Sequence, residues 1–593
     1  MAKRQAEESL ENVDAAVASP ASKKARVEDE IDESERAAPI SAAPPSASIN
    51  GSTDAKANGN VSAQSHRHSH GHVFNREQDE RRGEDILAAA DVEGEELEEA
   101  VGTDDEEDEG DALHGIDEDQ SALTAPTRQI APTEGYNDLY LDTINRAVLD
   151  FDFEKLCSIS LSNINVYACL VCGKYFQGRG PKSHAYFHAL DVGHHVYVNM
   201  ETKKVYVLPE GYEVKNKSLD DIKFVVDPRL SREEVMKLDK EQKSAWDLSG
   251  RKYTPGFVGL NNIKANDYFN VIVHSLAHVS PLRNYFMLED FTSRPQLVQR
   301  FSTLIRKIWN PRAFKSHVSP HELLQEISLR SNKRFTLTEQ ADPVDFISWF
   351  LNNLHLALGG SKTKPGTSIV QKVFQGKLKV ESQQITARGD AGDRLRFEDA
   401  TVHSDISRFL MLTLDLPAAP LFQDEVEKNI IPQVPLTSLL TKYDGIRSQE
   451  HLNMRKRYRL LHPLPQHLLF HIKRFSKNKF VSERNPTIVT FSPRSLDMSP
   501  YVEPNPALHP PAEPIWYDLV ANVTHEAIRR RDDSVEVEAD AKVWRVQLRD
   551  KSRDEWVEVQ DLFVDRVSAE TLFTKESVLQ VWEKRKTAPP SKR

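Results

Sequence analysis

The chain has 593 residues, of which 28% are charged and 39% hydrophobic, and only three are cysteines. That length allows two or more domains, and so few cysteines exclude a disulfide scaffold and favour a reducing compartment. No apolar run reaches 18 residues and the N-terminus lacks the apolar core of a signal peptide, so neither a membrane span nor secretion is expected.

The net charge of −13 is distributed unevenly along the chain. Residues 84–119 contain 18 Asp and Glu and no Lys or Arg, so this segment carries −18 and the remainder +5. The densest part, residues 104–109, is typical of a solvated tail that screens charge or contacts a partner. A mildly basic body with such a tail is compatible with a ribonucleoprotein partner.

Residues 1–133 are predicted to be disordered, because a segment rich in Ala, Ser, Pro, Glu and Asp buries too little apolar surface to offset its ordering entropy. Within it the basic sequence Ser22–Arg26, preceded by Lys3 and Arg4, resembles a nuclear localisation signal and predicts a nuclear protein; a solvated charge run is the alternative. The alternating histidines His66–His72 favour adventitious metal binding, since a flexible segment gives them no supporting contacts.

Residues 134–235 contain a metal-ligand pattern. Cys169-Leu-Val-Cys172 presents two sulfurs from one tight turn, and His188 and His194 follow, with 15 and 5 residues between successive ligands. Four such ligands complete a tetrahedral zinc site with no open position, which is typical of a structural rather than a catalytic metal. We therefore expect one structural Zn2+; the alternative is two buried cysteines with unrelated histidines.

Three further potential ligands lie nearby. Cys157 and His184 would form half of a second metal site, but Cys157 has no close cysteine partner because position 160 is Ser160. Packing of Cys157 as a small apolar residue is therefore favoured. His195 remains an alternative ligand to its neighbour His194.

The stretch from Cys157 to Val198 resembles the UBP-type zinc finger. In that family the finger often receives the free C-terminal tail of ubiquitin in a pocket lined by an arginine and aromatic side chains. The corresponding position here is Lys174, whose ammonium lacks the planar fork that grips a carboxylate in two places. The resemblance implies the fold, whereas the lysine argues against binding of the ubiquitin tail.

Residues 236–253 separate this module from a second domain at 254–588, and the polar stretch 237–252 is predicted to be a helical linker. The second domain carries four boxes that resemble, in order, those of the ubiquitin-specific protease family. They are Gly259–Asn270; Gln340–Phe346 with Leu351 and Leu354; Leu464–Phe475; and Tyr517–Asp561. The resemblance implies an α+β protein, in which the UBP-type zinc finger precedes a papain-like fold with thumb, palm and fingers.

The catalytic groups that this resemblance implies are missing. A thiol protease needs a thiolate, a histidine that accepts its proton and a third group that orients the histidine. Asp267 stands at the nucleophile position and Val543 at the histidine position, whereas Asp561 matches the orienting group. A carboxylate is a poor nucleophile toward an isopeptide, and an aliphatic side chain cannot carry a proton. No catalytic residue is therefore expected, and the chain is predicted not to be an enzyme.

Two substitutes for the missing groups are conceivable. His525 lies on a strand of the last box, where a satisfied structural histidine is favoured over a general base. Asp267 and Asp561 would activate water only with the shared-proton geometry of aspartic proteases, for which this scaffold is not built. The fingers of many family members also hold a zinc with two cysteine pairs. None exists here, so residues 376–430 are expected to hold together by sheet packing alone.

Within this family, a UBP-type finger joined to a protease domain without its catalytic cysteine and histidine resembles the inactive members found in the U4/U6.U5 tri-snRNP. This resemblance implies a nuclear, non-catalytic scaffold of pre-mRNA splicing whose partners are spliceosomal tri-snRNP proteins. The alternative is an adaptor that recognises ubiquitin conjugates without cleaving them, and a protease with unconventional chemistry ranks third. The basic stretches Arg455–Arg459 and Arg529–Arg531 leave direct contact with snRNA open, although indirect contact is favoured because no RNA-binding fold is recognisable.

Overall fold

The computed structural model describes residues 139–389, 395–399, 401–418, 431–451, 454–477, 482–510, 513–529 and 540–586. The predicted disordered tail, the localisation signal, the histidine tract and the acidic segment lie outside these residues. The described part combines helices and strands, which confirms the α+β class. None of its helices is long and apolar enough to span a membrane.

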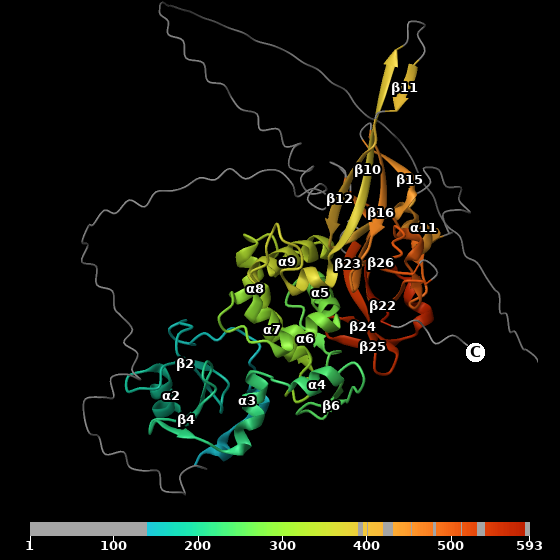
Figure 1. Ribbon diagram of the computed structural model, residues 1–593. Helices are drawn as coiled ribbons and strands as arrows, with labels where there is room; N and C mark the ends of the chain where they lie inside the picture. The colour runs from blue at the N-terminus through green and yellow to red at the C-terminus, as the bar shows by residue number, and fades with distance from the viewer. Residues whose placement is uncertain are drawn as a thin grey trace, which may run out of the picture. The chain divides into compact units, whose positions relative to one another are not determined.

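The first module is built on a five-stranded antiparallel sheet with the order β2-β1-β3-β4-β5 (Figure 1). Its strands are β1 (Val166–Cys169), β2 (Tyr175–Gln177), β3 (Val196–Asn199), β4 (Val205–Val207) and β5 (Tyr212–Val214). Alternate side chains of β1 enter two separate apolar clusters, one with α3 (Asp220–Val226) and the other with α2 (His184–Val192). Because both faces are covered, β1 and β3 are buried along their whole length.

The stretch predicted to be a helical linker is helical only at its start. Helix α4 (Arg232–Lys237) begins with a capping box and ends at Lys237. Beyond it the chain forms a short hairpin of β6 (Ala245–Trp246) and β7 (Lys252–Tyr253), so the helix expected over 237–252 is wrong. The hairpin turn forms because Asp247 accepts hydrogen bonds from the N–H groups of residues 249 and 251, and Gly250 takes a positive φ of 77°.

The second domain has a helical layer in which α5 is central. Its helices are α5 (Asp267–Ala277), α6 (Ser280–Leu288), α7 (Gln296–Ile308), α8 (His321–Arg330), α9 (Pro343–Ala357) and α10 (Ile369–Phe374). Every residue of α5 is buried, because helices cover one side of it and a sheet covers the other. Aromatic rings join the layer: Phe301 packs edge-on against Phe286 and Phe350, with centroids 4.8 and 5.0 Å away.

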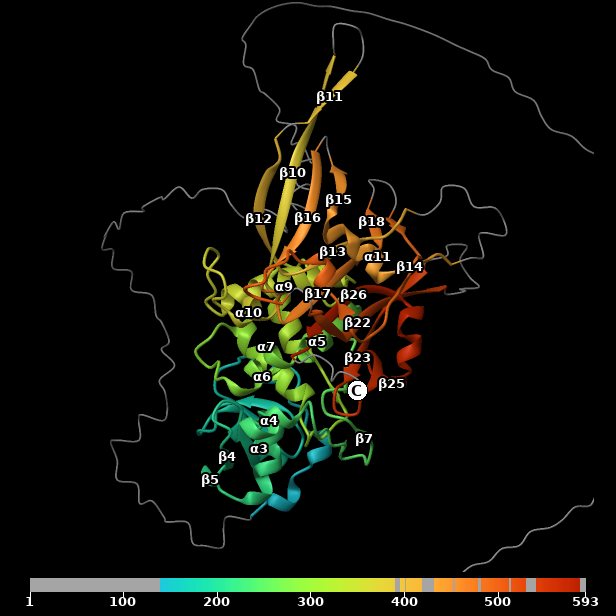
Figure 2. The same cartoon turned by 45° about the vertical axis from the view of Figure 1, so that its right-hand side comes forward.

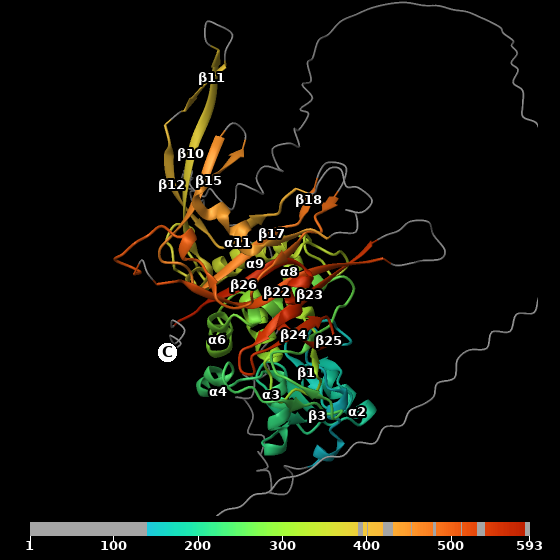
Figure 3. The ribbon, with the colours of Figure 1, turned by 90° about the vertical axis from the view of Figure 1, so that its right-hand side faces the viewer.

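An eight-stranded mixed sheet, the palm, packs against α5. Its order is β13-β17-β26-β22-β23-β24-β25, with β21 paired to β22; Figure 3 shows β26, β22, β23 and β24 running side by side. The strands are β13 (Leu412–Asp415), β17 (His467–Lys473), β21 (Leu496–Asp497), β22 (Trp516–Arg529), β23 (Asp540–Asp550), β24 (Glu555–Gln560), β25 (Phe563–Val567) and β26 (Glu576–Lys584). Within the described residues, β13 and β17 pair in parallel and all other strand pairs of this sheet are antiparallel.

A second sheet, the fingers, extends from the palm and the helices (Figure 2). It contains β10 (Gly376–Gly389), β11 (Leu395–Asp399), β12 (His403–Phe409), β15 (Asp444–His451) and β16 (Met454–Leu461). The predicted range 376–430 covers β10, β11 and β12 but omits β15 and β16, which come from later in the chain and complete the sheet. Antiparallel pairing of β10 with both β12 and β16 joins the two parts.

Short elements complete the second domain. They are β8 (Gly259–Leu260), β9 (His317–Val318), β14 (Gln433–Pro435), α11 (Leu436–Leu440), β18 (Phe475–Lys477), β19 (Ser482–Arg484) and β20 (Ile488–Thr490). Of these, β8 has functional interest because its backbone bonds to the turn that follows β24: the N–H of Leu260 donates to the carbonyl of Asp561 at 2.9 Å. This bond brings the first and last boxes together.

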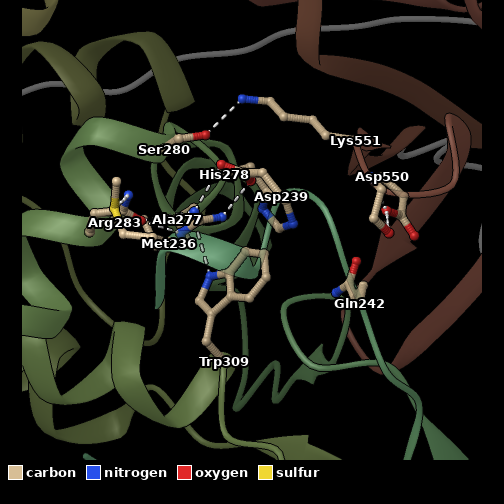
Figure 4. Close-up of polar contacts among 12 residues, drawn as sticks. Met236, Asp239, Gln242, Ala277, His278, Ser280, Arg283, Trp309, Asp550 and Lys551 are labelled. Atoms are coloured by element: carbon tan, nitrogen blue, oxygen red, sulfur yellow. Dashed lines mark hydrogen bonds and ion pairs between the residues drawn. The ribbon is translucent and has the colours of Figure 1, made fainter. Parts of the chain in front are cut away.

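A buried arginine fastens the segment after α4 to the helical layer. Arg283 on α6 is 1% exposed and donates to the two carboxylate oxygens of Asp239 at 2.8 and 3.0 Å (Figure 4). Its guanidinium lies over the ring of Trp309, 4.6 Å from the centroid, and Trp309 donates its indole N–H to the carbonyl of Ala277. Because a buried cation needs a partner, the pair fixes where this segment lies.

Candidate functional site

The four predicted zinc ligands lie together. One ligand atom from each of Cys169, Cys172, His188 and His194 lies within 4.8 Å of the others. Cys172 Sγ is 3.4 Å from His188 Nε2, and that nitrogen is 3.2 Å from His194 Nδ1. Ligands at ordinary Zn–S and Zn–N bond lengths on a tetrahedron would lie about 3.6 and about 3.3 Å apart. The cluster therefore has the size and the donor set of a closed zinc site.

Local backbone geometry positions these ligands. Gly173 has φ 76°, and a Cβ there would lie 2.6 Å from a backbone carbonyl oxygen, so glycine is required in the turn after the two cysteines. Gly193, with φ 74°, ends α2 and turns the chain so that His194 can face His188. The ring of Phe176 stacks on His188 with centroids 4.1 Å apart and orients it.

The neighbouring candidates lie outside the cluster. Cys157 is buried, and its sulfur accepts the N–H of Ser160 at 3.4 Å. His195 is engaged elsewhere, because its Nδ1 lies 2.7 Å from a backbone carbonyl and its ring stacks on Tyr140. His184 begins α2 and is not part of the cluster. Among the residues that the structure describes, no other group of three or more potential ligands is found.

At the nucleophile position, Asp267 is a 5% exposed hydrogen-bond acceptor at the start of α5. Gln340 Nε2 donates to its two carboxylate oxygens at 2.8 and 2.6 Å and to the carbonyl of Lys542 at 3.0 Å. The N–H groups of Tyr268 and Trp544 donate to the same carboxylate at 2.9 and 3.2 Å. Burial raises the pKa of Asp267, and these donors oppose the shift. The carboxylate thus joins α5, the loop before α9 and β23.

Asp561, in the turn after β24, is also held by amides. Asn270 Nδ2 and Asn262 Nδ2 donate to its two carboxylate oxygens, each at 3.0 Å. Within the described ranges no hydrogen bond joins Asp561 to Asp267, and amide donors occupy each carboxylate. The shared-proton pair that would activate water is therefore not formed.

Among the residues that the structure describes, no histidine forms a hydrogen bond with Asp267. Val543, on β23, is half-buried and aliphatic. His525, on β22, is 3% exposed and packs edge-on against Phe475 and Trp544, with centroids 5.0 Å away in both cases. Glu576 Oε2 lies 3.5 Å from its Nδ1, but neither ring nitrogen has a hydrogen-bond partner in the described structure. The structural role of His525 stays a prediction, whereas the expectation that the hydrogen bonds of its ring are satisfied is wrong.

Sequence reasoning missed the amide partners of both carboxylates. Asn262, Asn270 and Gln340 all stand in the recognised boxes, which is the signal that singles them out. The pairing of each amide with its carboxylate depends on how β8, α5 and the loop before α9 pack together. Residue spacing along the chain does not predict this packing. Through these contacts, the carboxylates of Asp267 and Asp561 connect separate elements of the second domain.

Two family profiles match the chain. The profile described as ubiquitin carboxyl-terminal hydrolase matches residues 258–585, and the profile described as Zn-finger in ubiquitin-hydrolases and other protein matches residues 157–219. The first covers the helical layer, the fingers and the palm. The second covers the sheet of the first module and all four predicted zinc ligands.

The chain is similar to several proteins over most of their length. It is 51% identical to the probable mRNA-splicing protein ubp10 of Schizosaccharomyces pombe, covering 75% of this chain and 88% of that protein. It is 45% identical to human ubiquitin carboxyl-terminal hydrolase 39, covering 79% and 85%, and 34% identical to the pre-mRNA-splicing factor SAD1 of Saccharomyces cerevisiae, covering 76% and 94%. A solved structure described as an essential yeast splicing factor matches with a TM-score of 0.60 and 32% identity, covering 75% of this chain and 100% of that chain.

Proposed function

The chain belongs to the ubiquitin carboxyl-terminal hydrolase family, and from this membership we propose that it is a non-catalytic pre-mRNA splicing factor. It acts in the nucleus as a scaffold that helps to assemble or stabilise the U4/U6.U5 tri-snRNP, with spliceosomal proteins as partners. The observation that carries this proposal is similarity, along three quarters of the chain, to proteins named as splicing factors. The positive charge of the chain outside residues 84–119 agrees with a ribonucleoprotein setting.

In this proposal each part of the chain has a binding role. Residues 134–235 form the finger, with one structural Zn2+ on Cys169, Cys172, His188 and His194. Residues 236–253 connect it to a binding domain at 254–588. The finger and the protease fold then serve as surfaces for protein partners.

Recovery of the chain with its partners tests the function. A tagged chain purified from nuclear extract should recover spliceosomal proteins together with the U4, U5 and U6 snRNAs, whereas the tag alone recovers neither. Recovery of ubiquitin conjugates without snRNAs would contradict the scaffold and favour an adaptor for ubiquitin. That adaptor has less support, because Lys174 stands where a ubiquitin-binding finger of the family carries arginine.

The absence of catalysis has a direct test. We expect the purified chain to cleave di-ubiquitin no faster than an enzyme-free blank, because N–H donors occupy both carboxylate oxygens of Asp267 and no histidine in the described structure is hydrogen-bonded to it. Asp267→Asn keeps the shape of the side chain and should be equally inactive, and so should His525→Gln, which removes the buried histidine considered above as a substitute base. Turnover by the natural chain that either Asp267→Asn or His525→Gln abolishes would refute the proposal.

A further inference from the structure

One face of the fingers sheet gathers positive charge. Successive side chains of a strand point to opposite faces, and residues directly paired in neighbouring strands share a face. The pairs Lys377↔Arg408, Lys379↔Arg459 and Glu381↔Arg457 therefore lie on the same face of β12, β10 and β16, which Figure 2 shows side by side. We call this the basic fingers face. Its cations are Lys377, Lys379, Arg408, Arg455, Arg457 and Arg459.

Acidic neighbours compensate these cations only in part. Lys379 Nζ lies 3.1 Å from Glu381 and 3.6 Å from Glu503, and Arg455 lies 3.4 Å from Glu450. Within the described structure, Lys377 and Arg457 have no ion-pair partner, and both side chains are exposed. Carboxylates lie directly opposite Arg455, Arg457 and Arg459 in the sheet, but Lys377↔Arg408 and Lys379↔Arg459 place like charges opposite each other, which destabilises a sheet.

The face is also hollowed where the cations meet. A hollow of about 240 Å³ is lined by residues that include Lys379, Arg457, Arg459 and Glu503. The Nε–H groups of Arg455 and Arg459 are buried and find no acceptor in the part of the chain that the structure describes. These two buried groups hold their arginines in place beneath the face, whereas the exposed side chains of Lys377, Arg408 and Arg457 are the cations that a partner can reach.

We propose that the basic fingers face binds the phosphate backbone of double-stranded RNA. The guanidinium fork matches phosphate oxygens in pairs, and the exposed Arg408 and Arg457 offer such forks beside the ammonium of Lys377. Tyr458, the aromatic residue of β16, contributes to the lining of the hollow, but it pairs with Val380 and its ring packs edge-on against Tyr443, so this ring is not free to stack on an unpaired base. Contact limited to the backbone suits a duplex, whose recognition depends on shape and phosphates rather than on base sequence.

This inference adds a partner to the proposed function. The inference rests on the proposed function only in one respect: the function places the chain in a complex that contains RNA. Binding to a purified duplex can therefore fail while spliceosomal proteins are still recovered, and it can succeed when they are not.

Binding of the full chain to an RNA duplex of about 16 base pairs tests the inference by fluorescence anisotropy across a range of salt concentrations. The double variant Lys377→Gln and Arg457→Gln removes two exposed cations without disturbing an ion pair. If each contacts one phosphate, affinity should fall roughly 50-fold at 0.1 M salt and the slope of log K against log salt should become shallower by about 1.8. The matched control, Arg232→Gln with Lys240→Gln, removes two exposed cations at and after α4 and should change neither quantity.

Three outcomes would overturn the inference. The first is that the natural chain does not bind the duplex. The second is that the control double variant loses as much affinity as Lys377→Gln with Arg457→Gln. The third is that Lys377→Gln with Arg457→Gln weakens binding to polyglutamate of matched charge as much as it weakens binding to RNA. The last result would assign the face to acidic polymers in general. Duplexes of unrelated sequence should bind with equal affinity, because backbone contacts carry no sequence information.

Discussion

Cys169→Ser should abolish zinc binding and unfold the finger, whereas the second domain should remain folded. Structural zinc contributes about 10–16 kcal/mol of apparent binding free energy in small fingers, which is more than a module of this size gains from its core. The residues packed around the ligands, Tyr167, Phe176 and Tyr197, form a small cluster that closes over the site. Without the metal this cluster loses the centre around which it packs.

Metal content and hydrogen exchange of the full chain measure both effects. The natural chain should carry one zinc per molecule and Cys169→Ser close to none, with loss of exchange protection confined to residues 157–219. Cys157→Ser is the matched control, because it makes the same chemical change at a buried cysteine outside the ligand cluster. Two zinc ions per chain, or loss of zinc in Cys157→Ser, would show that the assignment of four ligands to a single site is wrong.

The zinc ligands could be predicted because their geometry is mostly local. Cys169 and Cys172 share one turn, and a single helix carries His188 and leads to His194. Residue types at fixed spacing then determine most of the site, whereas the environment of Asp267 is assembled from distant parts. Gln340 and Trp544 are 73 and 277 residues away from it, and only the packing of α5 against β23 brings them to the carboxylate.

The linker shows a second reason why prediction from the sequence can fail: a local turn can outweigh helix propensity. A polar, charged stretch favours a helix when nothing else competes, but Asp247 and Gly250 make a turn that outweighs this propensity. The role of Asp239 was likewise not encoded in its neighbourhood. Its partner, Arg283, is 44 residues away and belongs to another element. Charge compensation in the interior therefore explains the path of this segment better than local preference does.

That compensation is strong enough to measure. Burial by itself would raise the pKa of Asp239, but the hydrogen bonds and the charge of Arg283 outweigh it and lower the pKa to about 2. Since the folded pKa lies below the ordinary value, the stabilisation is present above about pH 4 and is lost as the pH falls through 2. The pair should therefore contribute equally at pH 5 and at pH 8.

Asp239→Ala should lower the free energy of unfolding of the second domain by about 3–5 kcal/mol, because it leaves the buried guanidinium of Arg283 without a counter-charge. Denaturant midpoints at pH 5 and at pH 8 measure the loss, which should be the same at both. Asp345→Ala is the matched control in the same domain: its ion pair with Arg334 is solvent-exposed and should change stability by no more than about 1 kcal/mol. Adding Arg283→Met to Asp239→Ala removes the stranded charge and should restore part of the loss. Arg283→Met alone completes the comparison. If the double variant loses as much free energy of unfolding as Asp239→Ala and Arg283→Met lose in sum, then packing of Arg283 on Trp309, and not charge compensation, holds this segment in place.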